Sequence, residues 1–180
     1  EVRRFWRHRD VSEVARRGRA GRSSYAIYQE PLAVVVHAWP DQARLLATVD
    51  LLARHRAMQG ATPYQRLAWS AHGLSVEVSV EQALGPRVEG LDLARFNDVC
   101  RQAAAEGVAE GQALADRLGL WYDGASAYAS FAPQAVGAVW SALRTLWDAD
   151  LLRQERRVVS FCPRCATPLS AAEAARQAVE

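Results

Sequence analysis

Two cysteines three positions apart are the clearest candidates for chemistry in this chain. Cys162 and Cys165 enclose Pro163 and Arg164, and this spacing allows two thiolates to hold one tetrahedral metal ion from a tight turn. A structural zinc site needs four ligands, so the pair predicts a zinc half-site whose other ligands come from outside the segment. The alternative is a metal-free turn with two thiols. Cys100 falls on the apolar stripe of a predicted helix, where a small buried hydrophobe is expected.

A second candidate lies where a predicted strand gives way to a helix. His72 and Gly73 follow the strand, which places a polar group at the carboxyl edge of a parallel sheet, where ligands bind in such folds. The alternative is a histidine satisfied by backbone groups. The chain contains neither G-x-x-x-x-G-K nor G-x-G-x-x-G. The spacing of its residues supports no Ser–His–Asp or Cys–His arrangement.

Composition indicates a globular protein of a reducing compartment. The 180 residues are half apolar, which favours a buried core over disorder. Neither an apolar run of about 18 residues nor a charged-then-apolar leader occurs, so we expect a cytoplasmic protein without a membrane partner. Residues 1–22 carry eight arginines against three acidic residues. This basic stretch is either an RNA-binding arm or a solvated helix face.

Alternating strand and helix patterns predict a parallel α/β sheet. Strands are expected at 24–28, 62–68 and 157–161, and helices at 5–18, 41–58, 75–84, 92–118 and from Pro133 onward. Asp41 is the predicted N-cap of helix 41–58, which would connect the first two strands as a crossover. In the last helix Val136, Trp140 and Trp147 form a stripe that we expect to be buried against the sheet or helix 92–118.

Motifs along nearly the whole chain then point to one family. They are Phe5-Trp6-Arg7, Trp69 with His72-Gly73-Leu74 and Glu77, Leu118-Gly119-x-Trp121-x-Asp123, and the Cys-Pro-Arg-Cys knuckle with Thr167-x-Leu169-Ser170. Together they resemble the isoleucyl branch of the class I aminoacyl-tRNA synthetases. The resemblance implies the N-terminal half of a Rossmann-type nucleotide-binding domain. It divides the chain into a basic helical arm at 1–23, half of the catalytic core at 24–156, and the root of an inserted editing domain at 157–180.

The resemblance also implies an activity. The family activates isoleucine with ATP and transfers it to tRNA, so ATP is the implied cofactor and tRNA the implied partner. The implied substrate-binding positions are Pro31, Trp69, Ser70, His72 and Glu77.

The positions that would face ATP depart from the family pattern. The His-x-Gly-His motif falls on Trp39, Pro40, Asp41 and Gln42, so both histidines are absent. In the family they stabilise the triphosphate while the adenylate forms, and a tryptophan cannot supply that stabilisation.

Three further positions also lack the residues with which the family contacts ATP or the amino acid. Glu30 and Val36 replace glycines that allow the backbone to approach ATP closely, and Glu30 would repel phosphate. Ser70 stands where the family has an Asp for the ammonium group of the amino acid. We therefore expect a degenerate homologue that does not form adenylate by itself and binds a protein partner or RNA. The alternatives are a segment of an active isoleucine–tRNA ligase with an altered site, and a repurposed accessory protein that binds a small molecule or a protein.

Overall fold

The computed structural model describes residues 13–14, 17–18, 21–29, 31–34, 39–123, 127–169, 171 and 174. Most of the predicted helix 5–18 and of the basic arm, together with Glu30 and Val36, lies outside the described residues. The chain falls into two compact units, Glu1–Val139 and Trp140–Glu180. The division into 1–23, 24–156 and 157–180 stays a prediction.

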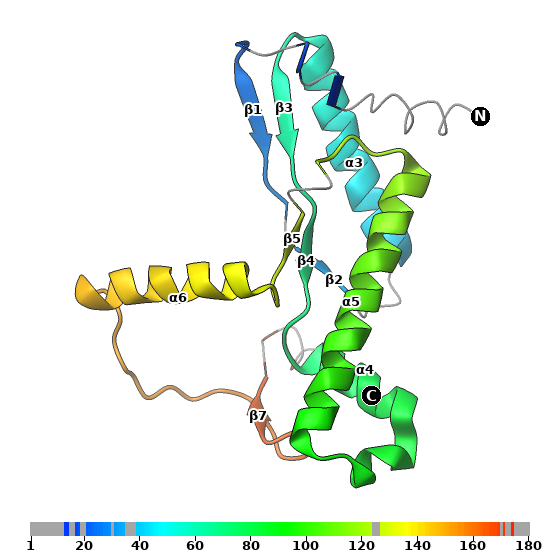
Figure 1. The fold of residues 1–180 in the computed structure, drawn as a ribbon. Helices are drawn as coiled ribbons and strands as arrows, with labels where there is room; N and C mark the ends of the chain where they lie inside the picture. Colours follow the sequence, from blue (N-terminus) through cyan, green and yellow to red (C-terminus); the bar gives the residue numbers. More distant parts are fainter. Residues whose placement is uncertain are drawn as a thin grey trace. The chain divides into compact units, whose positions relative to one another are not determined.

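The strands of the first unit are parallel, as predicted. β1 (Ser24–Ile27) pairs with β3 (Thr62–Gln65), and β4 (Ala68–Ser70) lies between β2 (Leu32–Ala33) and β5 (Tyr128–Ala129) (Figure 1). The predicted strand 62–68 is therefore two short strands that pair with different partners. This mixed α/β arrangement, with helices flanking parallel strands, is the predicted fold class.

Helix α3 (Trp39–Met58) joins β2 to β3 and packs against β1, β3 and α5. Its buried residues Leu46, Val49, Ala53 and Ala57 recur at helical spacing and form one apolar face. The predicted N-cap at Asp41 is wrong. The helix begins at Trp39, because a proline near the start of a helix loses no intrahelical hydrogen bond, and Asp41 lies in the first turn.

Two helices follow β4. α4 (Leu74–Leu84) leads into the 3-10 helix η1 (Gly85–Gly90), and α5 (Leu93–Leu118) follows, with Asp92 as its N-cap. The Asp92 carboxylate accepts a hydrogen bond from the Arg95 backbone N–H at 2.8 Å. Gly119 ends α5 in the left-handed conformation at a φ of 70°.

The core of this unit lies where α3 and α5 meet β2 and β4. Trp69 is completely buried there, together with Leu46 and Leu67. Gly107 and Gly111 of α5 are buried against Val34 and the Trp69 ring, respectively. Glycines that weaken the helix locally therefore serve the packing between elements, because only a missing Cβ leaves room for so close an approach.

Two predictions for the C-terminal region are wrong. Residues 157–160 form no strand. β6 (Phe161–Cys162) instead pairs antiparallel with β7 (Thr167–Pro168), because the intervening turn reverses the chain. In α6 (Pro133–Asp148) Trp140 and Trp147 are 68% and 64% exposed, although Val136 is partly buried. An apolar stripe identifies a face of a helix and not the partner that covers it.

None of the helices among the described residues combines the length and the apolar character needed to cross a membrane.

Candidate functional site

A cavity of about 400 Å³ lies beside the turn that follows β4. Its polar lining comes from His72 before α4, Glu77 on α4, and Asn97 and Arg101 on α5. Its apolar lining consists of the aromatic ring of Phe131 together with small or branched side chains. The cavity thus combines an apolar body with a few polar groups, which is the usual composition of a small-molecule site.

The turn after β4 is held by two hydrogen bonds to residue 130. The Ala71 N–H donates to Ser130 Oγ at 2.9 Å, and His72 Nε2 lies 2.9 Å from the Ser130 carbonyl oxygen. A carbonyl oxygen only accepts, so Nε2 is the donor in this contact. Gly73 has a φ of 97°, a conformation that favours glycine. Backbone geometry and Ser130 together position the imidazole.

The five predicted substrate-binding residues do not lie together. His72 and Glu77 both line the cavity. Trp69 is completely buried in the core, Ser70 is half-buried at the end of β4, and Pro31 is exposed. The structure therefore brings two of the five residues into one cavity, and the substrate-binding role of all five stays a prediction.

Sequence reasoning missed the contribution of α5 to this cavity. Asn97 and Arg101 are four residues apart on one helical face and line the cavity with Cys100. Arg101 Nη1 donates to Asp98 Oδ1 at 3.0 Å, so its charge is already partly compensated. Burial raises the pKa of the Cys100 thiol, and the nearby Glu77 carboxylate raises it further. The four-residue spacing of these two polar side chains was visible in the sequence. Only the fold shows which helix this face of α5 lies against.

The positions that correspond to His-x-Gly-His form the first turn of α3. The backbone of Trp39 begins the helix, Pro40 is exposed, and the exposed Asp41 forms an ion pair with Arg44 at 3.1 Å. Gln42 is half-buried, and its Nε2 donates to the Ala33 carbonyl oxygen at 3.2 Å. The Gln42 amide therefore links α3 to β2.

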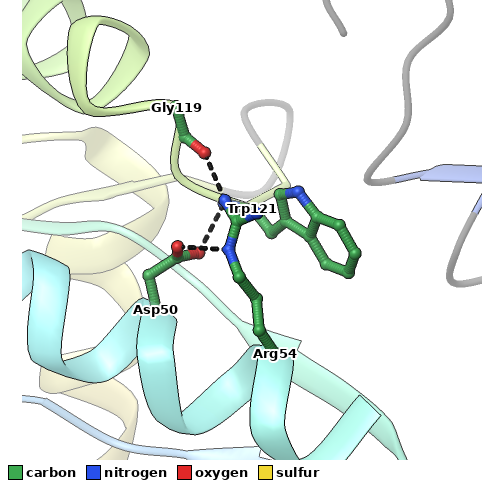
Figure 2. A network of polar contacts seen from close by, with 4 residues as sticks. All are labelled: Asp50, Arg54, Gly119 and Trp121. Atoms are coloured by element: carbon green, nitrogen blue, oxygen red, sulfur yellow. Dashed lines mark hydrogen bonds and ion pairs between the residues drawn. The ribbon is translucent and has the colours of Figure 1, made fainter. Parts of the chain in front are cut away.

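A buried polar network fixes the chain that follows α5 onto α3 (Figure 2). The Asp50 carboxylate accepts hydrogen bonds from Arg54 Nε at 2.6 Å and from the Trp121 backbone N–H at 2.8 Å. Arg54 Nη2 donates to the Gly119 carbonyl oxygen at 2.5 Å, and its guanidinium lies 4.6 Å from the centre of the Trp121 ring. The resemblance had matched Gly119 and Trp121 without indicating that they contact α3.

The knuckle residues Cys162 and Cys165 lie in the β6–β7 hairpin and are both partly buried. Hydrogen bonds from the Cys165 backbone and side chain lower the pKa of Cys162, and Arg164 adds to this effect. A lowered pKa favours the thiolate form of Cys162, which is the form of cysteine that binds zinc. However, the described residues contain no group of three or more His, Cys, Asp or Glu side chains that could hold a metal ion. Two donors do not complete a tetrahedral zinc site, so the half-site stays a prediction.

We expect elemental analysis of the purified 180-residue chain to find well below one zinc per chain, because two thiolates bind zinc weakly without further ligands. The matched control is the Cys162→Ser, Cys165→Ser double variant, which should bind still less. Stoichiometric zinc that resists a chelator would contradict the half-site.

Known proteins are similar to this chain over nearly its full length. The family model for tRNA synthetases class I (I, L, M and V) matches residues 1–180. The isoleucine–tRNA ligase of Thermus thermophilus is 34% identical over 181 residues, which cover 97% of this chain and 17% of the relative. That of Streptomyces coelicolor is 31% identical over 178 residues, covering 96% of this chain and 17% of the relative. The chain thus spans 17% of the length of these curated relatives.

A solved structure is similar to the chain in fold. It is a ternary complex of LeuRS, tRNA and LeuAMS from Agrobacterium radiobacter, with a TM-score of 0.72 and 16% identity over 94% of this chain and 20% of that chain. At this identity the likeness shows the Rossmann-type fold alone. The family match over all 180 residues carries the assignment, and the isoleucine–tRNA ligases are the relatives that the chain resembles: the chain belongs to the class I tRNA synthetases.

Proposed function

We propose that this segment belongs to a synthetase homologue that does not form an aminoacyl adenylate by itself. The first turn of α3 carries the proposal. At the positions of the two motif histidines stand Trp39 and Gln42, and the Gln42 amide is engaged with the Ala33 carbonyl oxygen. A side chain that joins a helix to a strand is not free to stabilise a developing charge on phosphate.

The charge at this turn supports the same proposal. The positive end of a helix dipole favours anions, but in α3 the Asp41 carboxylate already lies in the first turn. A triphosphate placed there would meet a carboxylate of its own charge, although Arg44 compensates part of it. The residues present at this turn therefore do not fit the triphosphate of ATP.

The retained fold supports a binding role for the segment. We propose tRNA or a protein as its partner and the cytoplasm as its location, since the family works on tRNA there. A second candidate function, a repurposed small-molecule binder, is favoured by the cavity at His72 and Glu77. The remaining alternative is a segment of an active isoleucine–tRNA ligase with an altered site.

The test is isoleucine-dependent ATP–pyrophosphate exchange by the natural full-length protein. Losing one charge-stabilising group costs about a hundredfold or more in rate, so losing several should leave no detectable exchange. The isoleucine–tRNA ligase of Thermus thermophilus serves as the positive control. The Trp39→His, Gln42→His double variant should remain inactive, because Asp41 and Glu30 are still present. Exchange by the unmodified protein above a no-enzyme control would overturn the proposal and favour the altered-site ligase.

A further inference from the structure

The β6–β7 hairpin holds Cys162 and Cys165 on the two sides of one tight turn. Cys162 ends β6 and pairs with Thr167 of β7, so the four residues 163–166 form the turn between paired strands. Ala166 closes this turn at a φ of 51°. A residue other than glycine keeps this conformation only where the structure around it holds it there. The pairing of the strands therefore fixes the turn without any bond between the cysteines.

The two thiols are in contact within this turn. The Cys162 sulfur accepts hydrogen bonds from the backbone N–H and from the thiol of Cys165. A disulfide places its two Cβ atoms about 3.5 to 4.5 Å apart, which is compatible with sulfurs that already touch. A bond between the two sulfurs therefore requires rotation of two side chains and no rearrangement of the hairpin.

Small molecules can reach the pair from solvent. Both cysteines are partly buried, while Pro163, Arg164 and Ala166 around them are exposed. In the part of the chain that the structure describes, no third His, Cys, Asp or Glu joins the two thiols in a group that could hold a metal ion. The neighbour with which each thiol can react is therefore the other thiol.

We propose that Cys162 and Cys165 form a thiol–disulfide exchange site, which a small-molecule disulfide converts reversibly into an intramolecular disulfide. One cysteine sulfur attacks the small disulfide, which forms a mixed disulfide and releases the first small thiol. The sulfur of the second cysteine then attacks the cysteine sulfur of the mixed disulfide and releases the second small thiol. The two cysteines together lose two electrons and two protons, and the two released thiols carry both.

The redox state of this pair decides whether it can bind a metal ion. The thiolate is the metal ligand, and the disulfide has no thiolate, so oxidation removes both sulfurs of the predicted half-site. In a reducing compartment such a disulfide is transient and forms while small-molecule disulfides accumulate. The hairpin would thus sense the ratio of small disulfides to thiols. This inference is independent of whether the full-length protein forms adenylate.

The experiment exposes the 180-residue protein to oxidised or reduced glutathione, without oxygen and with a metal chelator. Remaining thiols are blocked with iodoacetamide, and tryptic peptides are identified by mass spectrometry. Trypsin cleaves after Arg164, between the two cysteines, so an intramolecular disulfide joins two peptides that are otherwise separate. Excess oxidised glutathione should yield the joined peptides, and subsequent excess reduced glutathione should return both cysteines to the alkylated form.

Matched variants separate exchange within the pair from reaction of single thiols. Cys165→Ser should accumulate the mixed disulfide of Cys162 and glutathione at least about tenfold above the parent protein, because a second thiol in the same turn has a high effective concentration. Cys100→Ser removes the remaining cysteine, which lies on α5, and should leave the joined peptides unchanged. Circular dichroism verifies that both variants are folded.

Four results would overturn the proposal. The first is the absence of joined peptides in excess oxidised glutathione. The second is a mixed disulfide at Cys162 that accumulates equally in the parent protein and in Cys165→Ser. The third is a disulfide that joins two chains or includes Cys100 in place of the pair. The fourth is a joined pair that excess reduced glutathione does not reopen, because the exchange would then not be reversible.

Discussion

Replacing Asp50 by alanine is expected to lower the free energy of unfolding by about 3 to 5 kcal/mol. Asp50 is 7% exposed, and its carboxylate receives hydrogen bonds from Arg54 and from the Trp121 backbone. Its removal takes one acceptor from the half-buried Arg54 guanidinium and one from the Trp121 backbone N–H. Breaking one side of a buried pair is costly because the remaining charge is uncompensated.

The matched control for this prediction is Asp148→Ala. Arg144 and Asp148 also form a helical ion pair four residues apart, at 2.9 Å, but their side chains are 77% and 55% exposed, against 26% and 10% for Arg54 and Asp50. An exposed pair contributes about 0.2 to 1 kcal/mol, so this variant should unfold nearly as the parent protein does. Urea unfolding followed by circular dichroism measures both. Similar losses in the two variants would mean that burial of the Asp50 network does not stabilise the fold.

Replacing Gly111 by alanine should destabilise the protein by about 1 to 3 kcal/mol, although alanine is the better helix former. A Cβ at this position would overlap the ring of Trp69, which is completely buried and cannot move aside. At Gly107 the same atom would meet the Val34 carbonyl group, so Gly107→Ala should be destabilising as well. In both cases the cost of overpacking exceeds the gain in helix propensity.

Gly137→Ala in α6 is the control, and we expect it to stabilise the protein where Gly111→Ala destabilises it. A Cβ there meets nothing within 4 Å, so the substitution should raise the free energy of unfolding by about 0.5 to 1 kcal/mol. The three glycines are all helical, and only their surroundings differ. If Gly111→Ala stabilised the protein as Gly137→Ala does, α5 would not approach β4 as closely as the structure shows.

Several parts of the fold follow from the sequence because their causes are local. Helical spacing of apolar residues identified α3, α4, α5 and α6, and Asp92 and Pro133 mark starts that the structure retains. The strand–helix–strand order was enough to expect the parallel pairing of β1 with β3. The family resemblance, carried by motifs along the chain, is confirmed by the family match over residues 1–180.

The cavity and the Asp50 network could not be predicted in this way. Asp50 meets Trp121 across 71 positions of sequence, and Arg54 meets Gly119 across 65. No periodicity connects residues so far apart. Likewise, Asn97 and Arg101 line the cavity with His72 because α5 passes beside the β4–α4 turn.

What the sequence did not predict correctly also depends on contacts that no local pattern shows. Residues 157–161 have strand-forming composition, but a strand needs a partner to accept its backbone hydrogen bonds, and Phe161 and Cys162 find theirs in β7. Gly107 and Gly111 look unfavourable in a helix until Val34 and Trp69 are placed against them. Local pattern determines which elements form and which face is apolar. Contacts between distant residues determine which faces meet, which glycines are needed, and which polar side chains share a cavity.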